Sequence, residues 1–228
     1  MVWLYRRARY VMSLASKLFI SGGSGPTGEQ VFTSSGNWTA PKGVYRVSAV
    51  CIGGGGNGFR FVVSPTLTVS KGGGAGGLGW SNDIAVVPQQ NYTVKITSAG
   101  SYFISINTVW GQIGQTPSST SSGSQGGVHV GDGGGDGGAG HQANVTAGPP
   151  VVVGGGGSTG NYNSNGNDGN QNTYYGITQA QANAGLGKGS GSNISGNDVG
   201  NYGYGGTEYV SGTAGVVQLR WGINKDFS

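Results

Sequence analysis

The sequence predicts an all-β protein, in which a small antiparallel β-framework carries a slab of packed polyglycine II helices and long loops, after a short N-terminal helix or arm. Three observations support this prediction. Glycine contributes 51 of the 228 residues, far above the average of about 7%. Several runs alternate apolar and polar residues, which is typical of strands. Many glycines are spaced three residues apart. Aromatic residues make up 10% of the chain, which argues against plain disorder.

Charge and cysteine content exclude several classes of function. The formal net charge is +4, but Arg6, Arg7, Arg9 and Lys17 account for it, and the rest of the chain is balanced. A balanced body gives no electrostatic footprint for phosphate backbones, so we expect no nucleic-acid partner. The single cysteine, Cys51, excludes an intramolecular disulfide framework. No stretch reaches the roughly 18 apolar residues of a membrane helix, so we expect no membrane insertion.

Residues 1–28 are predicted to be an attachment segment and linker. Residues 1–20 contain neither Gly nor Pro, and Trp3, Tyr10 and Leu14 fall at helical spacing. A signal peptide would need a longer apolar core and a small-residue cleavage site, and a start at Met12 would remove the arginines. Residues 21–28 have linker composition. We expect the apolar side chains to bury against a partner: Trp3, Leu4, Tyr10, Leu14, Leu18 and Phe19.

Residues 29–228 are predicted to form one glycine-rich domain built on a β-framework. Residues 44–52 carry apolar side chains on both faces, as a central strand does, and Trp38 should cover the core. Residues 91–97 alternate as a half-buried antiparallel strand, after a predicted hairpin turn at residues 88–90. Further strands are expected at residues 30–34, 59–63, 67–69, 84–87 and 102–106, with a closing strand at 215–222.

The glycine spacing predicts polyglycine II helices. Glycines recur three apart at Gly73, Gly76 and Gly79, at Gly131, Gly134, Gly137 and Gly140, and at Gly154, Gly157 and Gly160. Three residues per turn is the period of the extended left-handed helix, which has no internal hydrogen bonds. Its backbone groups must therefore pair with neighbouring segments, and only glycine lets the backbones approach closely enough.

Four blocks occur in a characteristic order: VFTSSGNWTAPKGVYRV, IGGGG, GGGAGGLGWSNDIAVVPQQNYTVKI and GVVQLRWG. This order resembles the glycine-rich tip domain of tail-fibre and adhesin proteins of tailed bacteriophages, and it brackets roughly residues 30–222. Residues 59–70 depart from the pattern, because they interrupt the first glycine zone. The resemblance implies a sandwich of packed polyglycine helices, receptor recognition by loops, and a place at the tail or fibre tip of the virion after synthesis in the host cytoplasm.

The candidate receptor-contact residues are tyrosines in loops rich in Asn, Ser and Gly, a mixture that combines rigid contact area with adaptable hydrogen bonding. The candidate loops are residues 112–130, 158–176, 177–185 and 190–204. The tyrosines are Tyr162, Tyr174, Tyr175, Tyr202 and Tyr204. The alternative is that they cap glycine helices and pack sideways.

One cluster carries metal-ligand residue types: His129, Asp132, Asp136 and His141. It matches a repeat-type calcium motif only in part and in a single copy, so these residues are weak candidates and we expect no metal. The alternative is that the aspartates occupy exposed corners of a glycine helix. No nucleophile motif or phosphate loop is present. We therefore expect no catalytic residues, no cofactor and no enzyme activity.

The sequence thus predicts a virion adhesin that binds a bacterial surface protein or glycan. Its N-terminal segment would attach to other phage tail or fibre proteins or to copies of this chain, with a homotrimer natural on a symmetric fibre. One alternative is a purely structural virion component (fibre, tip or capsid-decorating protein) without receptor contact. Another is ice binding through a flat glycine slab, which would need a more regular array of side chains.

Overall fold

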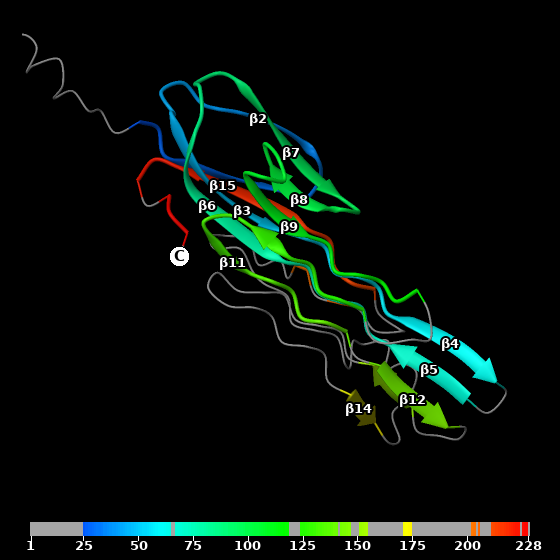
Figure 1. The fold of residues 1–228 in the computed structure, drawn as a ribbon. Helices are drawn as coiled ribbons and strands as arrows, with labels where there is room; N and C mark the ends of the chain where they lie inside the picture. Colours follow the sequence, from blue (N-terminus) through cyan, green and yellow to red (C-terminus); the bar gives the residue numbers. More distant parts are fainter. Residues whose placement is uncertain are drawn as a thin grey trace, which may run out of the picture.

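The structure is a computed structural model, and it describes residues 25–64, 67–118, 124–140, 142–146, 151–154, 171–174, 202–203, 205, 211–223 and 225–227. In these residues the chain is all-β and contains no helix, which confirms the predicted class. The molecule is elongated, with two larger sheets at one end and short hairpins at the other (Figure 1). We call the end with the two larger sheets the base and the opposite end the distal end.

The strands are β1 Gly28–Phe32, β2 Gly36–Thr39, β3 Arg46–Ile52, β4 Phe59–Ser64, β5 Leu67–Lys71, β6 Leu78–Ala85, β7 Asn91–Thr97, β8 Gly100–Phe103, β9 Val109–Gln112, β10 His129–Val130, β11 Gly133–Gly135, β12 Gln142–Thr146, β13 Val151–Gly154, β14 Gln171–Tyr174 and β15 Val216–Trp221. All strand pairs are antiparallel.

The base consists of two five-stranded sheets, with strand orders β1-β15-β3-β6-β11 and β10-β9-β8-β7-β2. Strand β3 is central in the first sheet, as its apolar residues on both faces predicted. The inner face of β3 contributes Val47, Ala49 and Cys51 to the main core, and β7 and β8 contribute Val94 and Phe103 from the second sheet. The two sheets therefore enclose one side-chain core between them.

Trp38 lies within this core rather than at its edge. Its side chain is only 2% exposed, and its ring meets Phe103 edge-on at a centroid distance of 5.9 Å and Trp221 at 5.4 Å. Aromatic side chains of this size dominate the burial of a small core, and tilted or edge-on contacts between their rings are favourable. The prediction that Trp38 packs against the core is confirmed, but Trp38 is part of the core and not a cover at its edge.

A second apolar cluster lies on the outer face of the first sheet and contains Val50, Ile52, Leu78, Val216 and Phe227. The C-terminal tail closes this cluster. The side chain of Asn82 accepts a hydrogen bond from Phe227 N at 2.9 Å and donates one to Phe227 O at 2.9 Å. One polar side chain thus pairs with both backbone groups of the buried Phe227.

Lys225 fastens the same tail by ion pairs, with its Nζ 2.7 Å from Asp83 Oδ1 and 2.8 Å from Asp226 Oδ1. The hydrogen bond and charge of Lys225 lower the pKa of Asp83. Burial works to lower the pKa of Lys225, but its two carboxylate partners outweigh burial and raise it. Each group therefore stabilises the charged form of the other.

The turn at residues 88–90 is not the hairpin turn that the sequence predicted. Strand β6 before it belongs to the first sheet and β7 after it to the second, where β7 pairs with β2 and β8. The turn therefore carries the chain from one sheet to the other. The backbone of this turn is hydrogen-bonded to the residue that follows β2, because Gln89 N donates to Ala40 O at 2.7 Å.

Candidate functional site

Among the described residues, six extended segments that belong to no sheet lie between the base and the distal end: residues 53–58, 72–77, 113–118, 124–128, 136–140 and 211–215. We call these six segments the glycine layer. Residues 72–77 are buried along their whole length, although Ala75 is their only residue with a side chain. The glycine layer therefore has a core made almost entirely of backbone.

Backbone hydrogen bonds across the glycine layer repeat every third residue. Gly53 N and Gly56 N donate to Gly77 O and Gly74 O at 2.9 and 2.8 Å. The same step recurs between the next segments. The backbone N–H groups of Gly74 and Gly77 donate to the carbonyls of Gln115 and Gln112, and the N–H groups of Gln112 and Gln115 donate to those of Val128 and Gln125. In the last segment, Gly137 and Gly140 donate to the carbonyls of Gly127 and Ser124. An antiparallel β-ladder alternates in steps of two instead.

Neighbouring residues within one segment bond to different segments. Gly74 N donates to Gln115 O, the next residue, Ala75, donates to Gly138 O, and Gly76 donates to Gly203 O. Successive peptide groups thus point in different directions around the axis of the segment. This explains how a segment without internal hydrogen bonds can satisfy its backbone while fully buried.

The layer requires glycine because of space and not because of backbone conformation. Among the described glycines, φ is positive at Gly43, Gly100, Gly134, Gly203 and Gly222, and none of these lies in the layer. A Cβ atom added at Gly53 or at Gly76 would instead lie 2.0 Å from a carbonyl oxygen of a neighbouring segment. At these two positions any residue larger than glycine would force the segments apart.

The ladders of the base continue through the glycine layer in unchanged register. The pair Ile52↔Leu78 of β3 and β6 is followed by the bonds from Gly53 and Gly56 and then by Phe59↔Lys71 of β4 and β5. Each step along one segment is matched by an equal step along the other. Strand β3, residues 53–58 and β4 thus form one side of a single long hairpin.

A second ladder runs the same way from β6 and β11 to β5 and β12. Gly135 pairs with Leu78, Gly138 O accepts from Ala75 N, and then Gln142 pairs with Lys71. A third leads from Ile52↔Val216 to the bond between Gly55 N and Thr213 O at 2.8 Å. The distal strands are therefore covalent and hydrogen-bonded continuations of the base.

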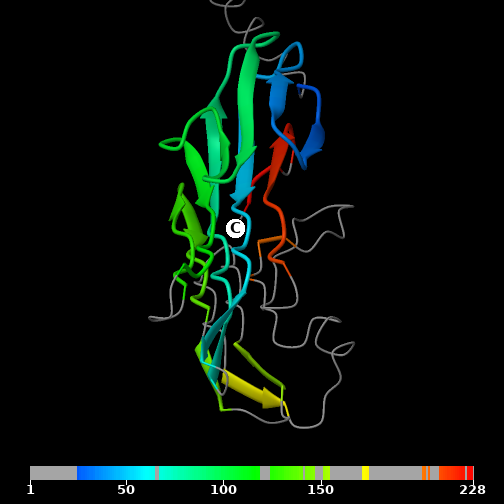
Figure 2. The ribbon, with the colours of Figure 1, turned by 90° about the vertical axis from the view of Figure 1, so that its right-hand side faces the viewer.

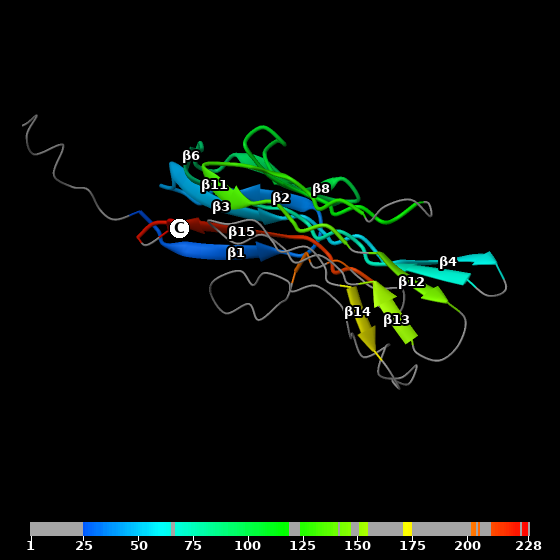
Figure 3. The same ribbon diagram turned by 60° about the horizontal axis from the view of Figure 1, so that its bottom comes forward.

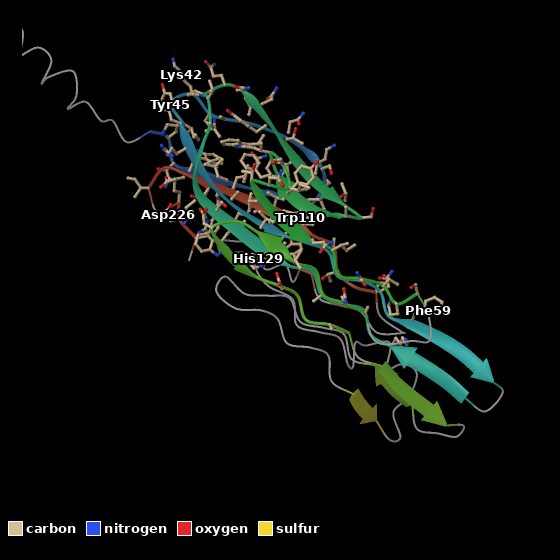
Figure 4. All side chains as sticks on the ribbon, in the orientation of Figure 1. Lys42, Tyr45, Phe59, Trp110, His129 and Asp226 are labelled. Carbon is tan, nitrogen blue, oxygen red and sulfur yellow. The ribbon has the colours of Figure 1, made fainter. Side chains whose placement is uncertain are left out.

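The distal end carries a three-stranded sheet of order β12-β5-β4 and the pair β13-β14. Figure 2 shows the distal strands at the end of the molecule farthest from the base, and in Figure 3 β4 and β12 reach farthest from it. Phe59, the first residue of β4, marks the point where the glycine layer ends, and it is 47% exposed (Figure 4). The strands β4 and β5 are predicted by the sequence, but their place at this end is not.

The prediction that residues 112–130 form a loop is wrong for most of these residues. Gln112 ends β9, residues 113–118 and 124–128 belong to the glycine layer, and β10 begins at His129. The physical reason is that these low-complexity residues pack through their backbones, which leaves no apolar periodicity to reveal them. The other predicted loops fall mostly outside the described residues.

Two of the five candidate tyrosines fall on described positions. Tyr202 is half-buried and packs against the second apolar cluster, so part of its ring serves packing. Tyr174 ends β14 at the distal end, where its backbone pairs with Val151. Tyr162, Tyr175 and Tyr204 lie outside the described residues, as do the candidate attachment residues Trp3, Leu4, Tyr10, Leu14, Leu18 and Phe19.

The weak metal candidates do not converge where they are described. Asp136 Oδ1 lies 2.7 Å from His129 Nδ1 and accepts a further hydrogen bond from His129 N at 3.0 Å. Asp132 Oδ2 instead accepts from Asn82 N at 2.8 Å, and His141 lies outside the described residues. Among the residues described, no three His, Cys, Asp or Glu side chains are grouped to hold a metal ion.

Comparison with known proteins finds no family model and no curated protein that matches this chain. The function must therefore be inferred from the sequence and from the arrangement of the base, the glycine layer and the distal strands.

Two reactive side-chain types lie in the interior. Cys51 is fully buried in β3, and burial raises the pKa of its thiol far above the ordinary value, which disfavours the nucleophilic thiolate. Lys71 is fully buried where β5 meets the glycine layer, and burial lowers its pKa. The described part of the chain has no helix long and apolar enough to cross a membrane.

Proposed function

We propose that the protein is a bacteriophage tail-fibre or tail-tip adhesin, which binds a protein or glycan on the bacterial surface through loops rich in Tyr, Asn and Gly. The observation that carries this proposal is the set of unbroken ladders that lead from the base to the distal hairpins. An adhesin must hold a recognition surface away from its mounting point in a fixed orientation. The glycine layer meets this need without a second side-chain core.

We further propose that the glycine layer is a bundle of polyglycine II helices. Three features support this finer description: the three-residue step of the hydrogen bonds, the absence of positive φ at the described layer glycines, and the close approach of neighbouring backbones at glycines such as Gly53, Gly56, Gly74 and Gly76. Polyglycine II has three residues per turn and a rise of about 3.1 Å, with all hydrogen bonds made to neighbours. Such a bundle resists bending because each segment is bonded on several sides.

In this proposal residues 1–28 join the adhesin to other tail or fibre proteins of the virion. The first described residue, Gly25, lies beside Gly43 of the base, and the last, Phe227, packs in the second apolar cluster on the first sheet. Attachment at the base leaves the distal end free for the receptor. Contacts by the loops that contain the candidate tyrosines Tyr162, Tyr174, Tyr175, Tyr202 and Tyr204 are proposed to set the choice of host. The protein would act by binding alone, without catalysis or a cofactor.

The test is a competition experiment with purified full-length chain. Bacteria that adsorb the encoding phage are incubated with the chain, and both binding to cells and inhibition of phage adsorption are measured. An adhesin should bind these cells saturably and reduce adsorption, whereas resistant cells should not bind it. A control variant, Tyr45→Ser, alters a side chain that is 67% exposed at the base and should leave binding unchanged.

Exchange of residues 158–204 between chains from phages of different host range distinguishes the adhesin from a structural virion component. Host range should follow the exchanged residues if they contact the receptor. An unchanged host range, in particles that assemble normally, would favour a purely structural role.

A further inference from the structure

We propose that Asn57 is a site of spontaneous covalent modification, in which its side-chain amide is lost through a cyclic imide formed with Gly58. The residue follows the glycine run of residues 53–56 at the junction between the glycine layer and β4. It is exposed and is followed by glycine, whose missing side chain leaves the approach to the amide unhindered. This inference does not depend on the adhesin function.

One of the two hydrogen bonds at Asn57 favours the reaction, and the other fixes its backbone. Asn57 Oδ1 accepts a hydrogen bond from Gly212 N at 3.0 Å, which draws electron density from the amide carbon, the atom that is attacked. The backbone N–H of Asn57 donates to Thr116 Oγ1 at 3.0 Å and holds the residue in place. The attacking atom is the backbone nitrogen of Gly58, which has no backbone acceptor among the described residues.

The reaction needs only water. The Gly58 nitrogen forms a bond to Asn57 Cγ and loses its proton, while the bond from Cγ to Nδ2 breaks and ammonia leaves. Water then opens the five-membered imide at one of its two carbonyls. Opening at one carbonyl leaves aspartate in the normal backbone, and opening at the other leaves isoaspartate, in which the former side-chain CH₂ joins the main chain. Neither step requires an oxidant, a reductant or an enzyme.

The position gives the modification a structural consequence. Asn57 lies between the bond of Gly56 N to Gly74 O and the pair Phe59↔Lys71, where the register must be kept for the distal hairpin to remain aligned. Isoaspartate lengthens the backbone at this point by one carbon atom. The β4 side of the first ladder can then no longer match β5, so the modification would gradually loosen β4 at the distal end. The ladder that leads from β6 and β11 to β5 and β12 does not pass through Asn57 and would remain.

Peptide mapping of the aged full-length chain tests the proposal. The folded protein is held at mildly alkaline pH, and samples are unfolded and digested with trypsin at intervals. Cleavage after Arg46 and Arg60 releases residues 47–60, in which Asn57 is the only asparagine. The expected result is a growing fraction of this peptide that is heavier by about one dalton, because OH replaces NH₂, and that separates into aspartate and isoaspartate forms.

The matched control is Asn57→Gln, which keeps an amide acceptor for Gly212 N but would need a slower six-membered ring. Its peptide should stay unmodified under the same conditions. A free synthetic peptide of residues 47–60 reports whether the conditions support the reaction. If this free peptide is converted while the folded chain stays at its zero-time level, the fold protects Asn57 and the proposal is wrong.

Discussion

The base and the glycine layer are two halves of the same ladders, yet they are stabilised in opposite ways. In the base, β3 and β6 are held by side chains such as Trp38 and Phe103 packed between two sheets. In the layer, residues 53–58 and 72–77 continue the same two strands with almost no side chains, and the buried material is peptide backbone. The base therefore depends on apolar surface removed from water, whereas the layer depends on hydrogen bonds and close contact.

Because of this difference, burial alone does not predict which substitutions a site tolerates. A core of side chains is sensitive to the removal of volume, because a cavity remains. A core of backbone is sensitive to the addition of volume, because no space exists for a Cβ atom. Substitutions in the two regions can test whether the base is sensitive to lost volume and the layer to added volume.

Gly76→Ala should cause the largest loss of stability. Its new Cβ atom would lie 2.0 Å from Gly53 O, so two buried segments must separate and lose their hydrogen bonds. We expect a loss in the free energy of unfolding above about 4 kcal/mol, which only severe mechanisms produce. Urea unfolding followed by tryptophan fluorescence measures it.

The matched control is Gly54→Ala, in the segment that faces Gly76. Its nearest neighbour would be Thr213 O at 3.2 Å, so a small adjustment suffices and the loss should stay within about 1 kcal/mol. Equal losses at the two positions would show that the layer is not packed as described.

Trp38→Ala tests the other half of the comparison. The substitution empties the centre of the main core and should cost about 3 to 5 kcal/mol. Trp38→Phe, which keeps an aromatic ring, should cost clearly less. Thermal unfolding of the three proteins gives the ranking, and a ranking in which Trp38→Ala is harmless would mean that the base does not rely on its side-chain core.

The ion pair between Asp83 and Lys225 should make the folding stability depend on pH, by a small amount whose sign the pKa shifts define. The pKa of Asp83 is lowered by Lys225, so the ion pair stabilises the fold above the unfolded pKa of about 3.9 and is lost as the pH falls through the lower, folded value. The pKa of Lys225 is raised, so its contribution is lost as the pH rises through the folded value, above about 10.4.

Asp83→Asn should therefore destabilise the protein near neutral pH and match the native chain in strong acid. Unfolding midpoints measured across the acid range check this. A difference between the two proteins that persists below the folded pKa of Asp83 would assign the loss to something other than the charge.

The sequence could predict the base far better than the glycine layer. Strand β7 was predicted with its bounds, and β3 and β15 nearly so, because apolar alternation reports directly on a half-buried or central strand. The sequence predicts a loop at residues 112–130, although residues 113–118 and 124–128 belong to the glycine layer, because backbone packing leaves no apolar period. The short β9 was missed since Gly111 interrupts its pattern.

The candidate site was harder to predict for a related reason. The residues of β4 and β5 are strand-like in sequence. Their place at the distal end depends on residues 53–58 and 72–77, which separate them from β3 and β6, and only the pairing of these two segments shows that both extend away from the base. Tyr202 illustrates the limit from the other side. Its polar, low-complexity surroundings predict a receptor contact, which stays a prediction. Nothing in those surroundings indicates that Tyr202 also packs against the second apolar cluster, whose residues come from β3, β6, β15 and the C-terminal tail.

The smallest predicted effect distinguishes the two reasons for needing glycine. In the layer the reason is space, but at the turns of the base it is backbone conformation, as at Gly43 and Gly222 with φ of 83° and 88°.

Gln89 occupies such a turn with φ of 66°, a left-handed conformation that costs a side-chain-bearing residue about 1 to 2 kcal/mol. Gln89→Gly relieves this strain and keeps the bond to Ala40 O. It also adds freedom to the unfolded chain, which offsets about 0.4 to 1 kcal/mol. We therefore expect a net stabilisation of about 0.5 to 1 kcal/mol, measured by thermal unfolding. The opposite change, Gly43→Ala, should destabilise although Pro26 Cδ, at 3.5 Å, leaves room for its Cβ atom. Destabilisation by Gln89→Gly would mean that its side chain contributes more to the turn than its strained backbone costs.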